Sequence, residues 1–180
     1  SLGYASRLVR PTDEWRKDWK TFYIQCAPPE RNRGGVISSV EHGNWMVTLV
    51  GGGKDYPPPD ESGFREFTQS LSDPRFEEAY AAAEPLTLIV ATKSTENRLR
   101  RSEALEGRPD GLVVIGDAVF AFNPVYGLGM SVAARGARIL DECLRQDAPI
   151  KNTSLPDRFQ VRLAKANARP WLLATGEDYR

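Results

Sequence analysis

The sequence has few of the residues from which metal sites and nucleophilic triads are built. Among its 180 residues there are one histidine and two cysteines, and Cys26 and Cys143 have no histidine or second cysteine near them. This spacing excludes a CxxC redox pair and a zinc site, so we expect no metal ligands. His42 lies in a turn-like sequence and is better explained as an exposed turn residue than as part of a triad. Two unrelated free thiols are typical of a cytoplasmic protein.

An excess of charge and a long apolar run are also absent. Lys plus Arg and Asp plus Glu each number 24, so no net charge attracts nucleic acid. The basic residues within 93–108 alternate with glutamates, which favours a solvated loop with local ion pairs. No apolar run approaches the ~20 residues that cross a bilayer, and no signal-peptide core begins the chain, so membrane association is not indicated.

A third absence is the glycine-rich fingerprint that binds dinucleotides, G-x-G-x-x-G between a strand and a helix. The glycines at 51–53 are followed by a turn-like stretch and three prolines, not by a helix. The chain also starts at Ser1 with a strand-like segment that has no lead-in. We therefore expect it to be a piece of a longer protein.

Alternating apolar residues predict an antiparallel sheet in the first half of the chain. Residues 41–44 fit a hairpin turn between two of its strands. By strand alternation, the candidate walls of a substrate pocket are Tyr23, Trp45, Val47, Leu49 and Leu88; ordinary core packing explains the same pattern equally well. The expected strands cover residues 1–11, 21–27, 34–41, 44–50 and 86–92.

Helix start signals occur at three aspartates, Asp60, Asp73 and Asp157. Each precedes an apolar stripe at helical spacing, and Pro74 occupies the first helical position after Asp73. Pro170 predicts a kink or an end in the last helix. The residues expected to face inward are Phe64, Phe67, Leu71, Phe76, Ala79, Tyr80, Ala83, Phe159, Leu163 and Ala166.

Residues 111–144 carry the strongest functional signal. A continuous apolar run at 112–115, ended by Gly116, predicts a strand that is buried on both faces. Such a strand delivers Asp117 to the carboxyl edge of the sheet, where ligands of open α/β sheets bind.

The loop that follows this strand has the residues of a ligand site. Asn123 precedes Pro124 and is therefore biased away from helical geometry. Gly127 and Gly129 let the backbone approach a ligand closely, and the helix that begins there directs its free N–H groups at the same place. The stretch predicts a site for a negative or electron-rich planar group.

The run from Gly116 to Met130 resembles the second flavin-binding motif of FAD-dependent monooxygenases of the para-hydroxybenzoate hydroxylase type. That motif reads G-D-A-A-H, three residues, P, two residues, G-x-G-x-N. The resemblance leans toward the branch that includes alkene epoxidases, because of Phe120, Asn123 and Tyr126. The positions that match are Gly116, Asp117, Ala118, Pro124, Gly127 and Gly129; those that depart are Phe120 (usually His), Leu128 (often Gln) and Ser131 (often Asn).

The resemblance implies FAD as the cofactor, NADH or NADPH as the reductant, and transfer of one oxygen atom to a small hydrophobic aromatic or alkene substrate. It places Asp117 on the ribityl chain, Pro124 along the isoalloxazine ring, and backbone N–H groups at the N1 and O2 edge of the ring. It identifies no catalytic acid or base. The cofactor-binding residues that it implies are Gly116, Asp117, Pro124, Gly127, Leu128, Gly129 and Met130.

The expected fold class is α+β. Residues 1–108 would form a largely antiparallel substrate-domain sheet with helices, and residues 109–180 the strand-loop-helix flavin segment with a C-terminal helix. This is an incomplete FAD-binding fold, so we expect the chain alone to be inactive and to need the N-terminal FAD-binding half or a second chain. The alternatives are a flavin-dependent halogenase, an isoprenoid reductase, and a non-catalytic binding or assembly module descended from such enzymes.

Overall fold

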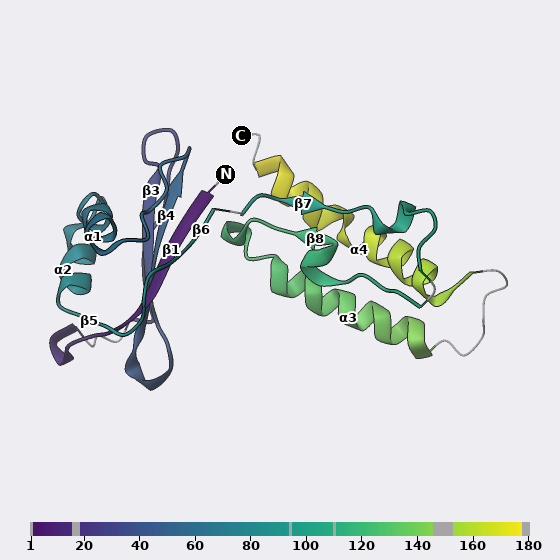
Figure 1. Ribbon diagram of the computed structural model, residues 1–180, viewed down its shortest axis with the longest axis horizontal. Helices are drawn as coiled ribbons and strands as arrows, with labels where there is room; N and C mark the ends of the chain where they lie inside the picture. The colour runs from purple at the N-terminus through teal and green to yellow at the C-terminus, as the bar shows by residue number, and fades with distance from the viewer. Residues whose placement is uncertain (1, 16–18, 94, 110, 146–152, 178–180) are drawn as a thin grey trace. The chain divides into compact units, whose positions relative to one another are not determined.

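The chain folds into two compact units, each with its own hydrophobic core. A computed structural model describes residues 2–15, 19–93, 95–109, 111–145 and 153–177. The first unit, Ser1–Thr95, is a sheet with two helices, and the second, Glu96–Arg180, is built on two long helices (Figure 1). The α+β class is therefore confirmed, and the two compact units divide between Thr95 and Glu96.

The sheet of the first unit is antiparallel in all its described pairings. Its order is β2-β3-β4-β1-β5, and β6 also pairs with β1. Between β3 and β4 the chain reverses at Glu41–Gly43, where exposed His42 has a φ of 61°, so the hairpin turn and the exposed histidine are confirmed. The strands are β1 (Leu2–Arg10), β2 (Thr21–Ile24), β3 (Arg33–Ser39), β4 (Trp45–Gly52), β5 (Glu84–Pro85) and β6 (Val90–Thr92).

The strand expected over residues 86–92 forms only in its last three residues. β5 ends opposite Val9 and β6 begins opposite Ser6, so residues 86–89 face only two residues of β1. The extra residues bulge out, and Leu88 is 85% exposed. Leu88 is therefore outside the core of this unit.

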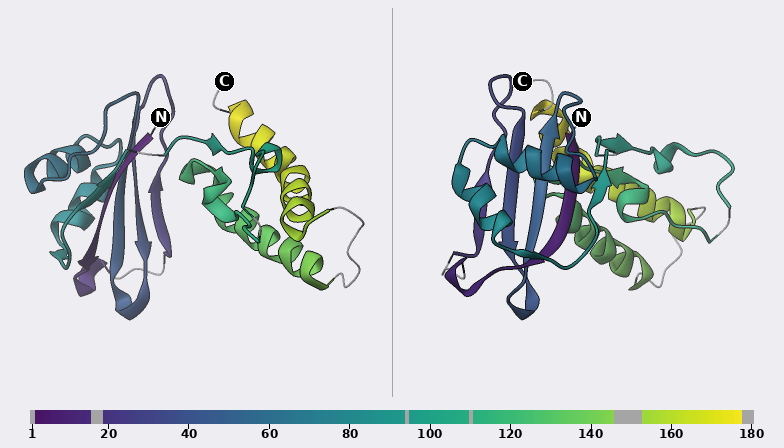
Figure 2. Two further views of the ribbon diagram at one scale, coloured as in Figure 1. Left: turned by 45° about the vertical axis from the view of Figure 1, so that its right-hand side comes forward. Right: turned by 60° about the vertical axis from the view of Figure 1, so that its left-hand side comes forward.

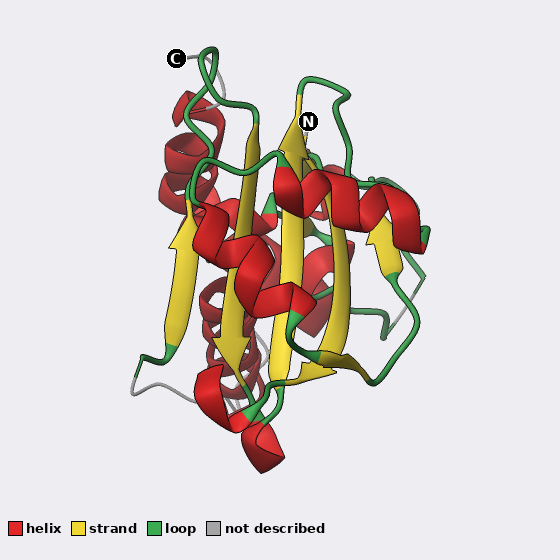
Figure 3. Ribbon diagram, turned by 90° about the vertical axis from the view of Figure 1, so that its left-hand side faces the viewer, coloured by secondary structure: helices red, strands yellow, loops and turns green. Residues whose placement is uncertain are grey.

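Helices α1 (Glu61–Gln69) and α2 (Pro74–Ala81) cover one face of the sheet (Figures 2 and 3). Asp60 and Asp73 cap them as predicted, accepting hydrogen bonds from the backbone N–H groups of Gly63 (2.9 Å) and Arg75 (3.0 Å). Caps of this kind satisfy donors that have no acceptor within the helix.

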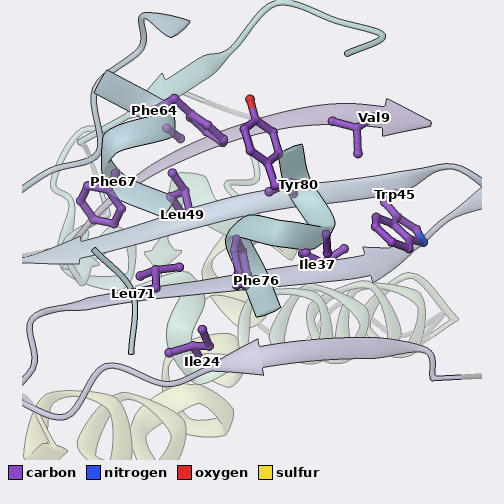
Figure 4. Packing of buried hydrophobic residues seen from close by; sticks show 13 residues of the cluster. Val9, Ile24, Ile37, Trp45, Leu49, Phe64, Phe67, Leu71, Phe76 and Tyr80 are labelled. Carbon is purple, nitrogen blue, oxygen red and sulfur yellow. The ribbon is translucent and has the colours of Figure 1, made fainter. Parts of the chain in front are cut away.

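The core between this sheet and its helices is aromatic-rich (Figure 4). Trp45, Val47 and Leu49 alternate along β4 and point into it, so the core interpretation holds for these three residues. Tyr23 lies between Phe22 and Ile24 in β2 and is 54% exposed, as alternation requires. The buried side chains include Ile24, Ile37, Phe64, Phe67, Leu71, Phe76, Ala79 and Tyr80.

In the second unit, α3 (Gly129–Arg145) and α4 (Leu155–Glu177) lie side by side (Figure 1), and β7 (Arg98–Leu99) pairs with β8 (Phe120–Ala121). Helix α4 contributes two aromatic side chains to this core, the buried Phe159 and the partly buried Trp171, which contacts the rings of Phe120 and Phe122. The buried residues of this core are Val119, Phe120, Phe122, Val132, Ile139, Cys143, Phe159, Leu163 and Ala174.

Helix α4 differs from expectation at its start, and of the two outcomes expected at Pro170 the end of the helix is ruled out. Ser154, not Asp157, caps it: the Ser154 Oγ accepts from the Asp157 N–H (3.2 Å) and donates to the Asp157 carboxylate (2.6 Å). The residues have the spacing of a capping box, but the Asp157 carboxylate accepts from the Ser154 hydroxyl and not from its backbone N–H. Pro170 does not end the helix, which continues to Glu177.

Residues 112–115 are not a strand, contrary to the prediction of a buried one. Leu112 is 46% and Ile115 36% exposed, and no described segment pairs with them. The Val114 carbonyl accepts instead from the Gln160 side chain of α4 (2.8 Å). An apolar run becomes a strand only beside other strands, and the described part of this unit offers none at that position.

Candidate functional site

Gly116 and Asp117 lie in a tight turn at the start of the candidate site. Gly116–Ala118 form a single 3-10 turn, closed by the bond from the Val119 N–H to the Gly116 carbonyl (2.9 Å). Gly116 has a φ of 63°, which a side chain would disfavour, and Asp117 is exposed. The turn therefore presents the carboxylate of Asp117 to the surroundings.

A second turn, Pro124–Tyr126, is stabilised by hydrogen bonds to two asparagines that are not part of the motif. The Asn123 side chain accepts from the Val125 N–H (3.3 Å), and the Asn123 N–H donates to the Asn97 side chain (2.9 Å). Asn123 is only 6% exposed. A hydrogen bond thus connects the loop to Asn97, which directly precedes β7. Motif spacing could not identify Asn97, because it lies outside the motif.

Helix α3 starts directly after this loop. Gly127 ends the turn in the left-handed region (φ 62°), and the Val132 N–H makes the first bond of the helix, to the Leu128 carbonyl (3.0 Å). The N–H groups of Gly129 and Met130 therefore have no acceptor within the helix. They carry the positive end of the helix dipole.

These elements enclose an open depression of about 390 Å³. Five of the seven predicted residues line it; Gly116 supports the turn behind it, and Leu128 packs against the core of the unit. Phe122 and Ala133 also line it and were not predicted, although Ala133 follows Met130 at helical spacing. The full lining is Asp117, Phe122, Pro124, Gly127, Gly129, Met130 and Ala133.

The depression fits a flat group that contacts backbone. A Cβ built on Gly127 or on Gly129 would meet no atom within 4 Å, so the glycines face open space. The lining includes Gly129 and Met130 of the helix start, the acidic residue Asp117, and the apolar residues Phe122 and Pro124. The site can accept a planar ring with acceptor atoms at its edge and hydroxyl groups beside it.

Other candidate functions find no support among the described residues. Arg98 pairs with Glu96 (3.5 Å), Arg100 donates to the Ala118 carbonyl (3.2 Å), and neither lines the depression. Within the described ranges, no group of three or more His, Cys, Asp or Glu residues could hold a metal ion. None of the described helices has the length and apolar character needed to span a bilayer.

The chain is similar in sequence to part of one longer protein and similar in fold to part of several solved structures. No protein-family model matches the chain. Protein Rv3254 of Mycobacterium tuberculosis is 32% identical over 168 residues, which are 93% of this chain and 34% of that protein. The chain thus spans about a third of the length of this relative.

Solved structures of flavin proteins match almost the whole chain. HpxO of Klebsiella pneumoniae, complexed with FAD and uric acid, aligns with a TM-score of 0.69 and 15% identity over 96% of this chain and 42% of HpxO. PqsL, a probable FAD-dependent monooxygenase of Pseudomonas aeruginosa, aligns with a TM-score of 0.63 and 13% identity over 97% of this chain and 47% of PqsL. Flavin-dependent halogenases are similar as well. The chain therefore has the fold of one part of the flavin-dependent monooxygenases.

Proposed function

We propose that this chain is the substrate-domain and flavin-ring part of an FAD-dependent monooxygenase. The observation that carries the proposal is the convergence of Asp117, Pro124, Gly127, Gly129 and Met130 around one depression at the start of α3. These residues were selected by the spacing of a flavin motif alone. The similarity in fold to proteins that bind FAD supports the same conclusion.

Four residues of the depression would hold the flavin. Asp117 would accept hydrogen bonds from ribityl hydroxyl groups, and Pro124 would contact the ring. The N–H groups of Gly129 and Met130 would donate to the pyrimidine edge of the ring, which becomes more negative when the flavin is reduced. Donors fixed at a helix start stabilise such charge by about 1 kcal/mol.

When bound, FAD supplies the redox chemistry, with NADH or NADPH as reductant and oxygen as the source of the inserted atom. The chain's own residues would orient the ring. For the substrate, the face of the sheet away from α1 and α2 offers cross-strand neighbours, Tyr23, Val36 and Thr48. This partly apolar surface suits a small hydrophobic aromatic or alkene substrate.

The free thiols of Cys26 and Cys143 agree with the cytoplasm as the compartment of the protein.

The test is the binding of FAD by the chain and by its Gly129→Ala variant. We expect the chain to quench flavin fluorescence weakly, because the contacts to the nucleotide end of FAD lie elsewhere. Alanine is tolerated by the protein at this helix start, where a Cβ meets nothing, but it would occupy space reserved for the ring. Gly129→Ala should therefore abolish quenching while the circular dichroism spectrum stays unchanged.

The full-length parent supplies the decisive control. It should purify yellow and release flavin on heating, and its Gly129→Ala variant should purify colourless. A colourless wild-type parent with no extractable flavin would contradict the proposal and favour a non-catalytic binding or assembly module. The isoprenoid reductase alternative predicts flavin but no consumption of oxygen.

A flavin-dependent halogenase is the second candidate, because halogenases are among the proteins of similar fold. Both reactions need oxygen and reduced flavin, but only halogenation needs a halide. Product formation by the parent should be measured with and without chloride or bromide. A product that appears only with halide would replace the monooxygenase assignment.

A further inference from the structure

A basic groove runs between α3 and α4, in a different place from the flavin-ring depression. It measures about 450 Å³ and is lined by four cationic side chains, two from each helix. Glu142 is the acidic residue of its lining. The cationic residues are Arg135, Arg138, Arg162 and Lys165, and we call this surface the α3–α4 groove.

The charges of the α3–α4 groove do not cancel. Arg138 lies 3.8 Å from Glu142, and Arg162 pairs with the same carboxylate, so one negative charge serves two cations. Arg135 contacts a neutral carbonyl, and Lys165 contributes a further exposed charge. In a chain whose acidic and basic residues are equal in number, this local excess of three positive charges creates a field that favours an anion.

Pro170 helps to build the α3–α4 groove. Proline has no N–H, so the carbonyl four residues earlier in the helix, that of Ala166, lacks its usual donor. The Nη1 of Arg135 donates to that carbonyl at 2.9 Å. This hydrogen bond fixes the guanidinium of Arg135 between the helices, so the Arg135 side chain loses less conformational entropy when an anion binds.

The groove and the flavin-ring depression lie on opposite sides of α3. Ala133 lines the depression and Arg135 lines the groove. Residues two positions apart in a helix project about 200° apart. A ligand of the groove is therefore separate from the flavin ring, and its recognition does not rest on the proposed function.

We propose that the α3–α4 groove binds a soluble small molecule that carries a diphosphate or two neighbouring phosphate groups. Planar guanidinium groups and an ammonium group, converging from two helices, are the donors that phosphate oxygens prefer. The groove is open and has a volume of about 450 Å³, which suits a small anion.

The test is a calorimetric titration of the whole chain with sodium pyrophosphate at low salt. We expect one saturable site, weakened by added salt because its charges are exposed. The double variant Arg138→Gln/Lys165→Gln should bind at least about tenfold more weakly, since it removes two charged donors. Absence of saturable binding, or equal binding by this variant, overturns the proposal.

A matched control lies on the same helix. Arg145 is 78% exposed and pairs with Asp141 at i, i+4, as Arg138, 74% exposed, pairs with Glu142, but Arg145 is outside the groove. Arg145→Gln should leave pyrophosphate affinity unchanged. An equal loss in this variant would mean that general charge, not the groove, binds the anion.

Glu142→Gln gives a test in the opposite direction. Removal of the competing carboxylate frees two guanidinium groups and should tighten binding by about two- to fivefold. Weaker binding in this variant contradicts the proposal.

Phosphate also occurs on lipid headgroups, and vesicles separate the two sources. The chain should not sediment with phosphatidic acid vesicles more than with neutral phosphatidylcholine vesicles. Sedimentation with phosphatidic acid, combined with no binding of soluble pyrophosphate, would reject a soluble ligand.

Discussion

At the scale of single residues, one arginine holds three segments of the first unit together. Arg33 of β3 forms a two-pronged pair with Asp55 (2.6 and 2.8 Å), donates to Ser70 after α1 (2.8 Å), and lies 4.5 Å from the centre of the Phe67 ring. The hydrogen bonds from Arg33, and its charge, hold the pKa of the Asp55 carboxyl below its ordinary value of 3.8. Short sequence motifs do not predict this cluster, because its residues are far apart in the sequence.

Asp55→Asn tests this pair through acid stability. Because the folded pKa is the lower one, the unfolded chain binds more protons at acidic pH, and the contribution of the pair disappears as pH falls through the folded pKa. Both side chains are more than a third exposed, so we expect less than about 1 kcal/mol. Urea unfolding should show Asp55→Asn less stable at pH 7 and the difference shrinking below pH ~4.

The double variant Arg33→Gln/Asp55→Asn is the control for that measurement. Arg33→Gln also removes the contacts with Ser70 and Phe67, so it should cost more than Asp55→Asn at pH 7. The stability of Arg33→Gln should show the same reduced pH dependence. The double variant should be no less stable than Arg33→Gln alone. A stability difference that stays constant from pH 7 to pH 3 would contradict the assignment.

At the scale of elements, the loop before α3 depends on backbone geometry more than on packing. Gly127 ends the Pro124–Tyr126 turn in the left-handed region, and its N–H donates to the Pro124 carbonyl (3.0 Å). The side chains around it are sparse, since an added Cβ would meet nothing. The left-handed φ of Gly127 therefore favours glycine at this position, and the space beside it is open to a ligand.

Gly127→Ala should destabilise the second unit by about 1 kcal/mol, the cost of placing a Cβ in left-handed geometry. Gly129→Ala has no such cost, because Gly129 is not in that region and begins a helix. The two variants can be compared by urea denaturation followed by far-UV circular dichroism. Equal stabilities would show that the turn adopts another conformation in solution.

At the scale of the whole molecule, the chain contains two independent cores. Phe64 is fully buried in the first unit and Phe159 in the second, and their clusters share no residue. Each core closes around its own helices. Damage to one core should therefore remain within its unit.

Phe64→Ala and Phe159→Ala test this independence. Each should destabilise its own unit by about 3 to 5 kcal/mol, through lost burial and the cavity that remains. Hydrogen exchange read by mass spectrometry should accelerate in β1, β3 and β4 for Phe64→Ala, and in α3 and α4 for Phe159→Ala. Faster exchange in both units from either substitution would mean that they unfold together.

Local signals in the sequence determined much of this protein. Alternation and capping residues predicted the strands from β1 to β4 and the starts of α1 and α2, because these features depend on neighbours within a few residues. Motif spacing also identified five residues of the depression, since a turn and a helix start position their own side chains. Alternation places Trp45, Val47 and Leu49 on one face of the sheet, but it does not specify that helices cover that face.

Tertiary structure decided what depends on a distant partner. Residues 112–115 have the sequence of a strand, but among the described residues no strand pairs with them. Leu88 bulges out because β1 offers too few residues opposite it. Asn97 and the α3–α4 groove come together only when separate segments meet. Hydrogen bonds and charges across such distances follow from the path of the chain in space, which short-range patterns do not specify.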